Sequence, residues 1–506
     1  MLRQIAVLFR HNNGPLQARV LHHLLALGGL LLFALPAAAQ GLPNLAALQS
    51  QGAAISAMVV DLERRSVVAA LHPDRPVIPA SATKLVTAAR ALEIWGADHR
   101  FTTRLAATAR PQGGRLPGDL LLIGGGDPAL TEEALWEMAR ALAHRGIREI
   151  TGDIIIDASR FGEVICSMRD RCEALQQNAH SYAAPLSAAG VNFSTISLEL
   201  QPGARPGEEV RARLQPFSLP SFEVASRVTT ANGANLKLTA VHRNLGDRER
   251  TEIAGAIPLG SDPIALRRSV AHPERLTGEL LRVLLEREGI SVAGELRFAY
   301  QPHFYEVVLA EHESAPLGDL LKGMMYYSNN FSADVLALEL ARTLGQAPPL
   351  SLPQAGAELG RYLHRSLAAS PFAEGAASQA YLRDGSGLDP DNRVSARELI
   401  ALLAAAYDRL DLFQPLLGSL PVPAHARSRL LKGDDPLWSS SVAGKTGGLS
   451  VPLSVTSYAG YLRFADGRWG AFAFIVNGAP GKPVARADAF AAMRRDFLLI
   501  RSANAS

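Results

Sequence analysis

A serine and a lysine three positions apart are the first residues in this sequence that could do chemistry together. Ser81 and Lys84 follow Pro79, whose fixed φ and missing N–H suit the first turn of a helix. Alanine, leucine and valine continue at helical spacing to about Trp95. On such a helix the two side chains lie on one face. If burial lowers the pKa of the lysine, its neutral amine can accept the serine proton and activate the hydroxyl as a nucleophile.

So short a motif can also be a capping serine followed by a surface lysine. The pattern of lysine usage in this chain makes that plainer interpretation less attractive. The chain has 51 lysines and arginines, but lysine stands only at positions 84, 237, 322, 432, 445 and 482. Arginine does not give up its proton, and its planar guanidinium differs from a compact point charge. We therefore expect lysine to be kept where arginine would fail.

A second polar cluster, Ser328, Asn329 and Asn330, follows two tyrosines inside a long helical pattern over residues 316–344. Side chains two positions apart diverge around a helix. Ser328 and Asn330 can therefore face one ligand only at a bend or a junction between helices. Simple exposure to solvent is the alternative.

The third cluster begins with Lys445 and Thr446, which are followed by two glycines, Gly447 and Gly448. Small residues next to a Lys-Thr pair indicate an edge strand whose backbone a substrate approaches closely. An ordinary glycine turn is the alternative.

The elements that must position these clusters change in character along the chain. Strands are expected at 55–60 and 66–70, and the texture after residue 100 is strand-rich, with segments at 101–105, 119–123, 154–156, 196–200 and 236–241 around a helix at 132–144. Helical patterns then cover 273–289, 316–344, 353–367 and 395–417. A hairpin, 457–464 and 469–476, precedes an amphipathic helix at 486–500.

Composition indicates a globular chain of two or more domains, with 48% hydrophobic and 20% charged residues among 506. Residues 1–39 carry three arginines and no acid, then an apolar run and small residues, which predicts a signal peptide cleaved near Ala39. An uncleaved membrane anchor is the alternative. No other apolar run is long enough to span a bilayer. Beyond residue 39 the chain is formally neutral, and no basic surface indicates nucleic-acid binding.

Two cysteines, Cys166 and Cys172, are the only ones in the chain. In an exported protein we expect them to form a disulfide that closes a small loop. A metal site is disfavoured, because two thiols need further ligands and no histidine lies at suitable spacing nearby. No His-Glu-x-x-His motif occurs either.

The three clusters, S-x-x-K, S-x-N and K-T-G in that order, form the pattern of penicillin-recognising serine enzymes. The sequence resembles the low-molecular-mass class C penicillin-binding proteins, the D-alanyl-D-alanine carboxypeptidase/endopeptidase family, over nearly the whole chain after the leader. The stretches that carry the resemblance are 79–84, 125–128, 328–330, 384–388 and 445–447. The wide gap between the first two motifs is typical of this family, in which extra domains are inserted there.

The resemblance implies an α/β (α+β) fold, a transpeptidase-like domain with an antiparallel sheet flanked by helices. Residues 40–100 and 300–506 would form this domain, and residues 101–299 would form strand-rich inserted subdomains. It further implies a periplasmic serine DD-peptidase that acts on D-Ala-D-Ala termini or cross-links of peptidoglycan stem peptides. β-Lactam antibiotics would be inhibitors, and no metal or cofactor would be needed.

The family also implies a role for each matching residue. Ser81 would attack the carbonyl of the penultimate D-alanine, with Lys84 as base. Ser328 would relay the proton to the leaving amine, and Asn330 would hold the substrate amide. The backbone N–H groups of Ser81 and Gly448 would form the oxyanion hole. The remaining substrate contacts, above all to the terminal carboxylate, would come from Lys445, Thr446, Gly447 and Gly448.

Two other functions compete with this one. Tyr327, Ser328 and Asn329 also spell Y-x-N, the second motif of some serine β-lactamases, in a register one residue away from that of Ser328 and Asn330. Only one register can face Ser81, and the long insertion and the Asp-Gly-Ser-Gly-Leu stretch at 384–388 favour that of Ser328. The other alternative is an idle wall-binding module on the same fold, but a module that only binds has no chemical need for the full set of reactive residues.

Overall fold

A computed structural model describes residues 41–506 except 176–179, 234–235, 427–428, 434 and 504–506. The predicted signal peptide, residues 1–39, lies outside the described residues. Helix α2 (Pro43–Gln49) is the first described element.

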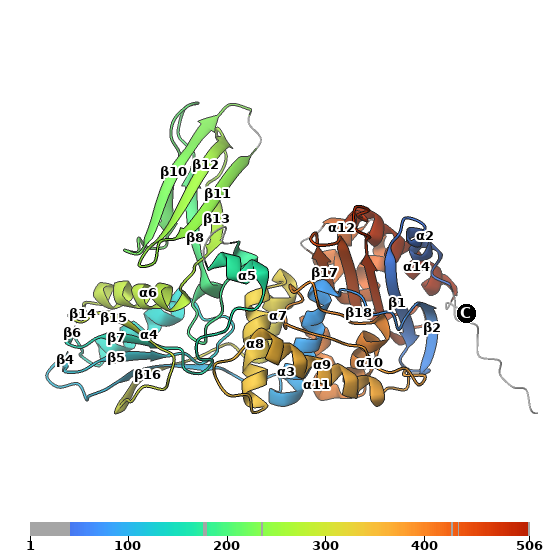
Figure 1. The fold of residues 1–506 in the computed structure, drawn as a ribbon, viewed down its shortest axis with the longest axis horizontal. Helices are drawn as coiled ribbons and strands as arrows, with labels where there is room; N and C mark the ends of the chain where they lie inside the picture. Colours follow the sequence, from blue (N-terminus) through green and yellow to red (C-terminus); the bar gives the residue numbers. More distant parts are fainter. Residues whose placement is uncertain (1–40, 176–179, 234–235, 427–428, 434, 504–506) are drawn as a thin grey trace, which may run out of the picture. The chain divides into compact units, whose positions relative to one another are not determined.

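The third reactive cluster lies on the edge strand β17 of a five-stranded antiparallel sheet of order β17-β18-β19-β1-β2, and the turn that carries Ser81 packs against β17 and β18. The strands are β1 (Ala54–Asp61), β2 (Ser66–Leu71), β17 (Val442–Leu449), β18 (Val455–Arg463) and β19 (Trp469–Asn477). Figure 1 shows the early strands β1 and β2 beside the late strands in this sheet. Ala54 pairs with Asn477, so the sheet joins the first described strand to the last.

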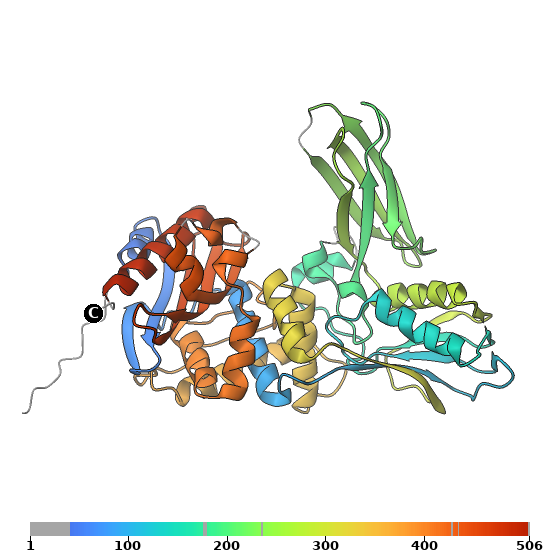
Figure 2. The ribbon, with the colours of Figure 1, turned by 180° about the vertical axis from the view of Figure 1, so that it is seen from behind.

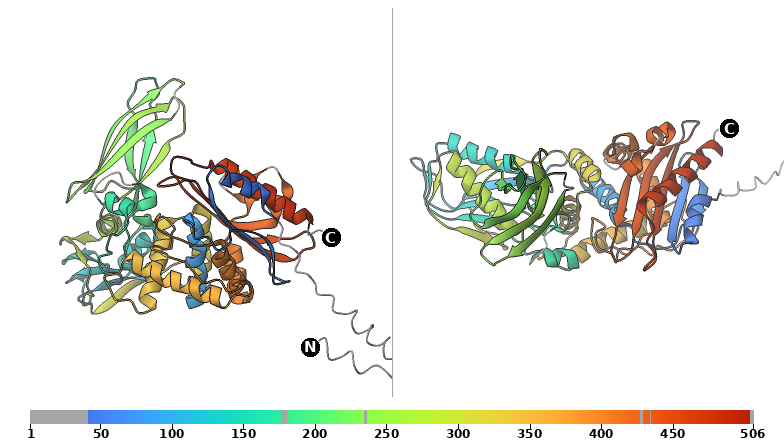
Figure 3. Two further views of the ribbon diagram at one scale, coloured as in Figure 1. Left: turned by 45° about the vertical axis from the view of Figure 1, so that its right-hand side comes forward. Right: turned by 90° about the horizontal axis from the view of Figure 1, so that it is seen from above.

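Alternation along β1 assigns the two faces of the sheet, because successive side chains of a strand point to opposite sides. Ile55, Ala57 and Val59 pack into one apolar cluster, together with α2 and α14 (Arg486–Ala503), which lie side by side on that face in Figure 3. Met58 and Val60 pack into another cluster on the opposite face. That face carries α10 (Ala396–Tyr407).

Besides α10, this second cluster contains the helix that begins at Lys84 and the helices around it. They are α3 (Lys84–Trp95), α7 (Leu317–Tyr327), α8 (Asn330–Thr343), α9 (Leu352–Ala368) and α11 (Leu410–Ser419). Helices α9 and α10 each begin with a capping box, formed by Ser351 with Gln354 and by Ser395 with Glu398. Two short helices, α12 (Arg429–Lys432) and α13 (Pro436–Ser441), precede β17.

The long insertion begins with a second five-stranded sheet, of order β15-β7-β5-β3-β16. Its strands are β3 (Thr102–Ala107), β5 (Leu120–Ile123), β7 (Ile154–Asp157), β15 (Leu296–Ala299) and β16 (Val307–Glu313). Helices α4 (Glu132–His144) and α6 (Pro273–Arg287) share one apolar cluster with it. A small sheet of order β14-β6-β4 adds Arg115–Leu116 (β4), Glu149–Ile150 (β6) and Ser291–Val292 (β14).

Two three-stranded sheets make up the rest of the insertion, and Figure 2 shows their long green strands. One has the order β13-β8-β9, with β8 (Thr195–Gln201), β9 (Arg211–Gln215) and β13 (Ile264–Ser269). The other has the order β10-β12-β11, with β10 (Phe222–Ala231), β11 (Lys237–Asn244) and β12 (Glu249–Pro258). The short helix α5 (Arg169–Ala174) precedes them.

The predicted fold class, with helices flanking an antiparallel sheet and strand-rich insertions, is confirmed. Two details differ from the sequence-based expectation. The proposed domain boundary at residue 300 falls within one sheet, because β16 pairs with β3 on the far side of the insertion. The single helix expected over 316–344 is divided into α7 and α8, because Ser328 adopts a left-handed conformation with φ 55°.

Candidate active site

Ser81 lies on a 3-10 turn, η1 (Ala80–Thr83), rather than inside the first α-helical turn, and α3 begins at Lys84. Ala80 has φ 47°, a conformation that costs a non-glycine residue about 1 kcal/mol or more. Gly387 packs so closely against this turn that a Cβ there would lie 1.9 Å from the Ala80 carbonyl oxygen. A neighbouring loop therefore fixes the conformation of the turn that presents Ser81.

Lys84 is fully buried, and its Nζ donates three hydrogen bonds. The acceptors are Ser81 Oγ at 3.1 Å, Asn330 Oδ1 at 2.7 Å and the Ser386 carbonyl oxygen at 2.7 Å. Asn330 and Ser386 offer only acceptors here, so a neutral amine keeps its two remaining hydrogens on them. Its lone pair is then directed at the Ser81 hydroxyl.

The charge state of Lys84 suits a base. The pKa of Lys84 is lowered to about 8, mainly by burial and also by Arg171, against the opposing effects of the Asp334 and Asp384 carboxylates. A substantial fraction of the amine is therefore neutral near pH 7 to 8, which an exposed lysine would not provide.

The junction between α7 and α8 separates two neighbouring asparagines, of which the family resemblance favours Asn330 as the site residue. Asn330 contacts Lys84 through Oδ1, and its Nδ2 donates to the Tyr182 carbonyl oxygen at 3.1 Å. Asn329 instead caps α8 by accepting from the Ser332 N–H at 3.1 Å. The structure thus brings Asn330, two positions after Ser328, to Lys84, while the asparagine of the Y-x-N register serves a helix end.

Strand β17 brings the third cluster against the nucleophile. A Cβ at Gly447 would lie 2.8 Å from the Ser81 backbone nitrogen and 2.3 Å from Ser457 Oγ, so this approach requires glycine. Lys445 is buried and its Nζ donates to the Thr446 carbonyl oxygen at 2.7 Å. Burial, Lys84 and Arg486 all lower the pKa of Lys445.

Sequence reasoning missed Arg486 as a member of this region. A Cβ at Gly448 would lie 2.8 Å from the Arg486 guanidinium carbon, so this cation lies directly over the strand. Arg486 begins a helix with mixed charges, and nothing in the local pattern distinguishes it from other surface arginines.

Asp384 was also unassigned by sequence, although its stretch contributed to the family resemblance. Its carboxylate accepts from the backbone N–H groups of Gly387, Leu388 and Asp389 at 2.8–2.9 Å. These bonds hold the turn that directs the Ser386 carbonyl at Lys84. A buried aspartate in a glycine-rich turn is thus a structural element of the site.

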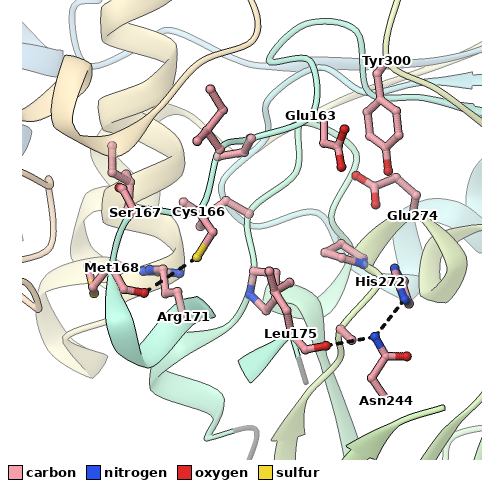
Figure 4. A pocket seen from close by; sticks show the side chains of 17 residues that line it. Glu163, Cys166, Ser167, Met168, Arg171, Leu175, Asn244, His272, Glu274 and Tyr300 are labelled. Atoms are coloured by element: carbon pink, nitrogen blue, oxygen red, sulfur yellow. Dashed lines mark hydrogen bonds between the residues drawn. The ribbon is translucent and has the colours of Figure 1, made fainter. Parts of the chain in front are cut away.

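Cys166 and Cys172 are joined in a disulfide, with Cα atoms 5.6 Å apart. Beside it lies a cavity of about 210 Å³, whose lining includes Cys166, Arg171, His272 and Glu274 (Figure 4). Among the described residues no group of three or more His, Cys, Asp or Glu side chains is arranged to hold a metal ion. Within that same part of the chain, no helix has the length and apolar character to cross a bilayer.

Comparisons with known proteins agree with the geometry of this site. A family model described as the D-Ala-D-Ala carboxypeptidase 3 (S13) family matches residues 39–495. A D-alanyl-D-alanine carboxypeptidase of Actinomadura sp. (strain R39) is 28% identical over 474 residues, covering 88% of this chain and 82% of the relative. The D-alanyl-D-alanine carboxypeptidase DacB of Haemophilus influenzae is 27% identical over 464 residues, covering 90% and 92%.

Among solved structures, penicillin binding protein 4 (dacB) from Haemophilus influenzae superimposes with a TM-score of 0.74 at 24% identity. The match covers 90% of this chain and 99% of that one. The same protein complexed with a novel β-lactam gives a TM-score of 0.71. These matches show that the fold is shared.

Proposed function

Because the chain belongs to the D-Ala-D-Ala carboxypeptidase 3 (S13) family, we propose that it hydrolyses the D-Ala-D-Ala bonds of peptidoglycan stem peptides through an acyl-enzyme on Ser81. The observation that carries this proposal is the contact of the buried Lys84 amine with the Ser81 hydroxyl, at 3.1 Å. A neutral amine in hydrogen-bond reach of a hydroxyl is the arrangement that an activated serine requires.

In the first half of the reaction, Lys84 removes the Ser81 proton as Oγ attacks the carbonyl carbon of the penultimate D-alanine. The backbone N–H groups of Ser81 and Gly448 receive the developing oxyanion, and each such donor is worth about 3 kcal/mol. The C–N bond then breaks, and the leaving amine takes a proton through Ser328. Water afterwards attacks the ester carbonyl and gives one proton to Lys84. The ester C–O bond breaks, the shortened peptide leaves as the carboxylic acid, and Ser81 Oγ takes that proton from Lys84.

Substrate binding uses the residues on either side of Ser81. Lys445 and Thr446 on β17 receive the terminal carboxylate of the peptide, and Asn330 holds the substrate amide. Asn330 Nδ2 donates to the Tyr182 carbonyl in the free protein, so a substrate amide competes with that carbonyl. β-Lactams carry the same carboxylate beside a strained amide, which makes them acylating inhibitors of Ser81.

The contact made by Asn330 favours the S-x-N register over the Y-x-N register of some serine β-lactamases. The peptidase register places a serine two residues before the asparagine that reaches Lys84, and this is the register that the side-chain contacts support. A non-catalytic wall-binding module has no use for the buried amine at Ser81. Peptidoglycan stem peptides are therefore the proposed substrates.

We extend the proposal to the setting of the enzyme. Residues 1–39 act as a signal peptide cleaved near Ala39, and the protein works in the periplasm. Residues 40–100 and 300–506 form the catalytic domain, and residues 101–299 form accessory subdomains. Two apolar clusters support this division in its main lines, but β16 (Val307–Glu313) pairs with β3 in the accessory sheet, and Phe161, Met168 and Ala188 of the insertion pack into the catalytic cluster.

The test is to incubate the protein, purified without its leader, with a fluorescent penicillin and to map the labelled peptide. The same preparation is assayed for release of D-alanine from a stem pentapeptide. We expect a long-lived adduct on Ser81 and D-alanine release, both absent from Ser81→Ala. Rapid turnover of the penicillin without D-alanine release would indicate a β-lactamase, and neither reaction would indicate a binding module.

A further inference from the structure

A buried ion pair connects the insertion to the catalytic helices close behind the nucleophile. Arg171 on α5 donates through Nη2 to Asp334 Oδ2 on α8, and the two side chains are 5% and 0% exposed. Arg171 also donates to the Ala184 carbonyl oxygen. Both charges are thus removed from water, and each depends on the other for compensation.

Asp334 is connected in turn to the loop that holds Lys84. Its Oδ1 accepts from the Gly385 N–H at 2.9 Å, and the next residue, Ser386, accepts from Lys84 Nζ. Asp334 lies one helical turn after Asn330, the other fixed acceptor of that amine. Asp334 is therefore connected to both acceptors that orient Lys84, to Ser386 through Gly385 and to Asn330 through the first turn of α8.

Four charged groups face the Lys84 amine. Asp334 from α8 and Asp384 from the glycine-rich turn favour its charged form, whereas Arg171 from α5 and Lys445 from β17 disfavour it. Lys84, Arg171 and Asp384 also act on Asp334, whose pKa burial raises. The neutral fraction of Lys84 thus depends on whether the Asp334 carboxylate is compensated.

We propose that Arg171 is a positioning residue for acylation, which compensates the buried Asp334 carboxylate so that Lys84 can release its proton at neutral pH. This inference rests on the proposed function, because it assumes that Lys84 acts as the base for Ser81. It assigns the insertion a part in the chemistry, since Arg171 lies inside the loop closed by Cys166 and Cys172. Figure 4 shows Arg171 beside Cys166 and Met168 in this loop.

The proposal predicts shifts of opposite sign for the two members of the pair. Without Arg171, the Asp334 carboxylate near Lys84 is uncompensated, and an opposite charge a few Å away typically raises an amine pKa by about 1 unit or more. Without the Asp334 charge, Arg171 is an uncompensated cation near Lys84 and lowers the pKa of Lys84. Asn at position 334 can still accept from the Gly385 N–H, so Asp334→Asn changes mainly the charge.

The experiment measures the second-order rate constant for acylation of Ser81 by benzylpenicillin between pH 5 and pH 10. This constant reports ionisations of the free enzyme. The variants are Arg171→Met, Arg171→Lys, Asp334→Asn and the double variant Arg171→Met/Asp334→Asn. The matched control is Arg160→Met, which removes another ion pair between the insertion and α8, that of Arg160 with Glu339; neither charge is among the main causes of the shift in the Lys84 pKa.

We expect Arg171→Met to move the rising limb of the pH–rate profile to higher pH by about 1 unit. Below that limb the acylation rate constant then falls about tenfold. Asp334→Asn should move the limb down, and the double variant should bring it back to the wild-type position or below. Arg171→Lys and Arg160→Met should leave it in place. A merely structural contribution would lower the rate at every pH in both single variants without moving the limb.

Two results would overturn the proposal while leaving the proposed function intact. One is a wild-type limb in Arg171→Met, which would mean that Asp334 itself takes up the extra proton. The other is a shift of the same sign in both single variants. If Arg171→Met fails to fold, the other two single variants still test the proposal. The limb of the pH–rate profile must move to lower pH in Asp334→Asn and must stay in place in Arg171→Lys. Absence of any acylation in the wild-type protein would instead refute the proposed function.

Discussion

Asn330 Oδ1 lies 2.7 Å from Lys84 Nζ, although 246 positions separate the two residues. This bond joins the start of α8 to the start of α3, and it uses one of the hydrogens of the amine. The Ser386 carbonyl uses another, so the direction of the lone pair is set by two acceptors that cannot themselves take part in proton transfer. The residues that orient the Lys84 amine, Asn330 and Ser386, are thus different from Ser81, the residue whose proton it accepts.

The nucleophile and the base should differ in how they tolerate substitution. Ser81→Ala should abolish both penicillin acylation and D-alanine release. Lys84→Arg should reduce acylation by about 10²-fold or more, because a guanidinium retains its proton and cannot act as a base. Stopped-flow acylation of the purified variants measures both. Near-normal acylation by Lys84→Arg would remove Lys84 from the role of base.

The two neighbouring asparagines provide a matched pair for the question of register. Asn330→Ala should slow acylation by about tenfold or more, because the amine loses an acceptor that orients it. Asn329→Ala should instead cost about 1 kcal/mol of stability through loss of a helix cap, with acylation little changed. Thermal unfolding and acylation rates separate the effects. If Ser328→Ala is silent and Tyr327→Phe is crippling, the β-lactamase register is correct.

Lys445 and Ser328 should affect different kinetic constants. Lys445→Ala removes the cation that receives the carboxylate, so it should mainly raise the concentration for half-maximal acylation, by about tenfold or more. Ser328→Ala leaves the carboxylate bound and removes a proton relay, so it should mainly lower the limiting rate. Saturation kinetics with a penicillin and with a D-Ala-D-Ala peptide resolve the two. Identical effects on both constants would contradict the separate roles.

Binding of a carboxylate should be accompanied by proton uptake. Burial and two neighbouring cations lower the pKa of Lys445 in the free protein, whereas a bound carboxylate favours the charged amine and raises it again. Between these two pKa values the complex binds one more proton, so affinity should increase as the pH falls through that window. Calorimetry of Ser81→Ala with a D-Ala-D-Ala peptide, in buffers of different ionisation enthalpy, measures the uptake. It should be absent from Ser81→Ala/Lys445→Met.

Gly447 should be irreplaceable even by alanine. An added Cβ would lie 2.8 Å from the Ser81 nitrogen and would push β17 away from the nucleophile, and a displacement of about 1 Å can cost about 10²-fold in rate. Gly418 is the control, since a Cβ there meets nothing within 4 Å. Acylation by Gly418→Ala should match the wild type. A fully active Gly447→Ala would show that the close approach is not needed.

The sequence predicted the residues of the site better than it predicted what holds them. Spacing and the scarcity of lysine pointed to Ser81, Lys84 and Lys445 as candidates. The divergence of side chains around a helix meant that Ser328 and Asn330 could face one ligand only at a bend or junction, with exposure to solvent as the alternative. These arguments use only local geometry. They could not choose between Asn329 and Asn330, because that choice depends on which side chain is used by the helix cap.

The supporting charges were beyond sequence reasoning for a different reason. Arg171 and Asp334 are ordinary surface residues by local pattern, and their burial depends on how the insertion packs against α8. The same is true of Arg486 over Gly448. The position of β1 between β19 and β2 is likewise a long-range pairing, which alternation along a single strand does not specify.

The pairing of Ala54 with Asn477 also constrains the order in which the chain can fold. Strands β3 to β16 find all their partners among residues 102–313, so the insertion can acquire its sheets while the C-terminal segment is still being synthesised or exported. β1 has only β2 to pair with until β19 arrives, and a two-stranded ribbon is marginal in water. A chain that stops before β18 therefore carries the nucleophile but no finished sheet to hold it. The strand that approaches Ser81 through Gly447, β17, can pair with its neighbour only after β18 has been made.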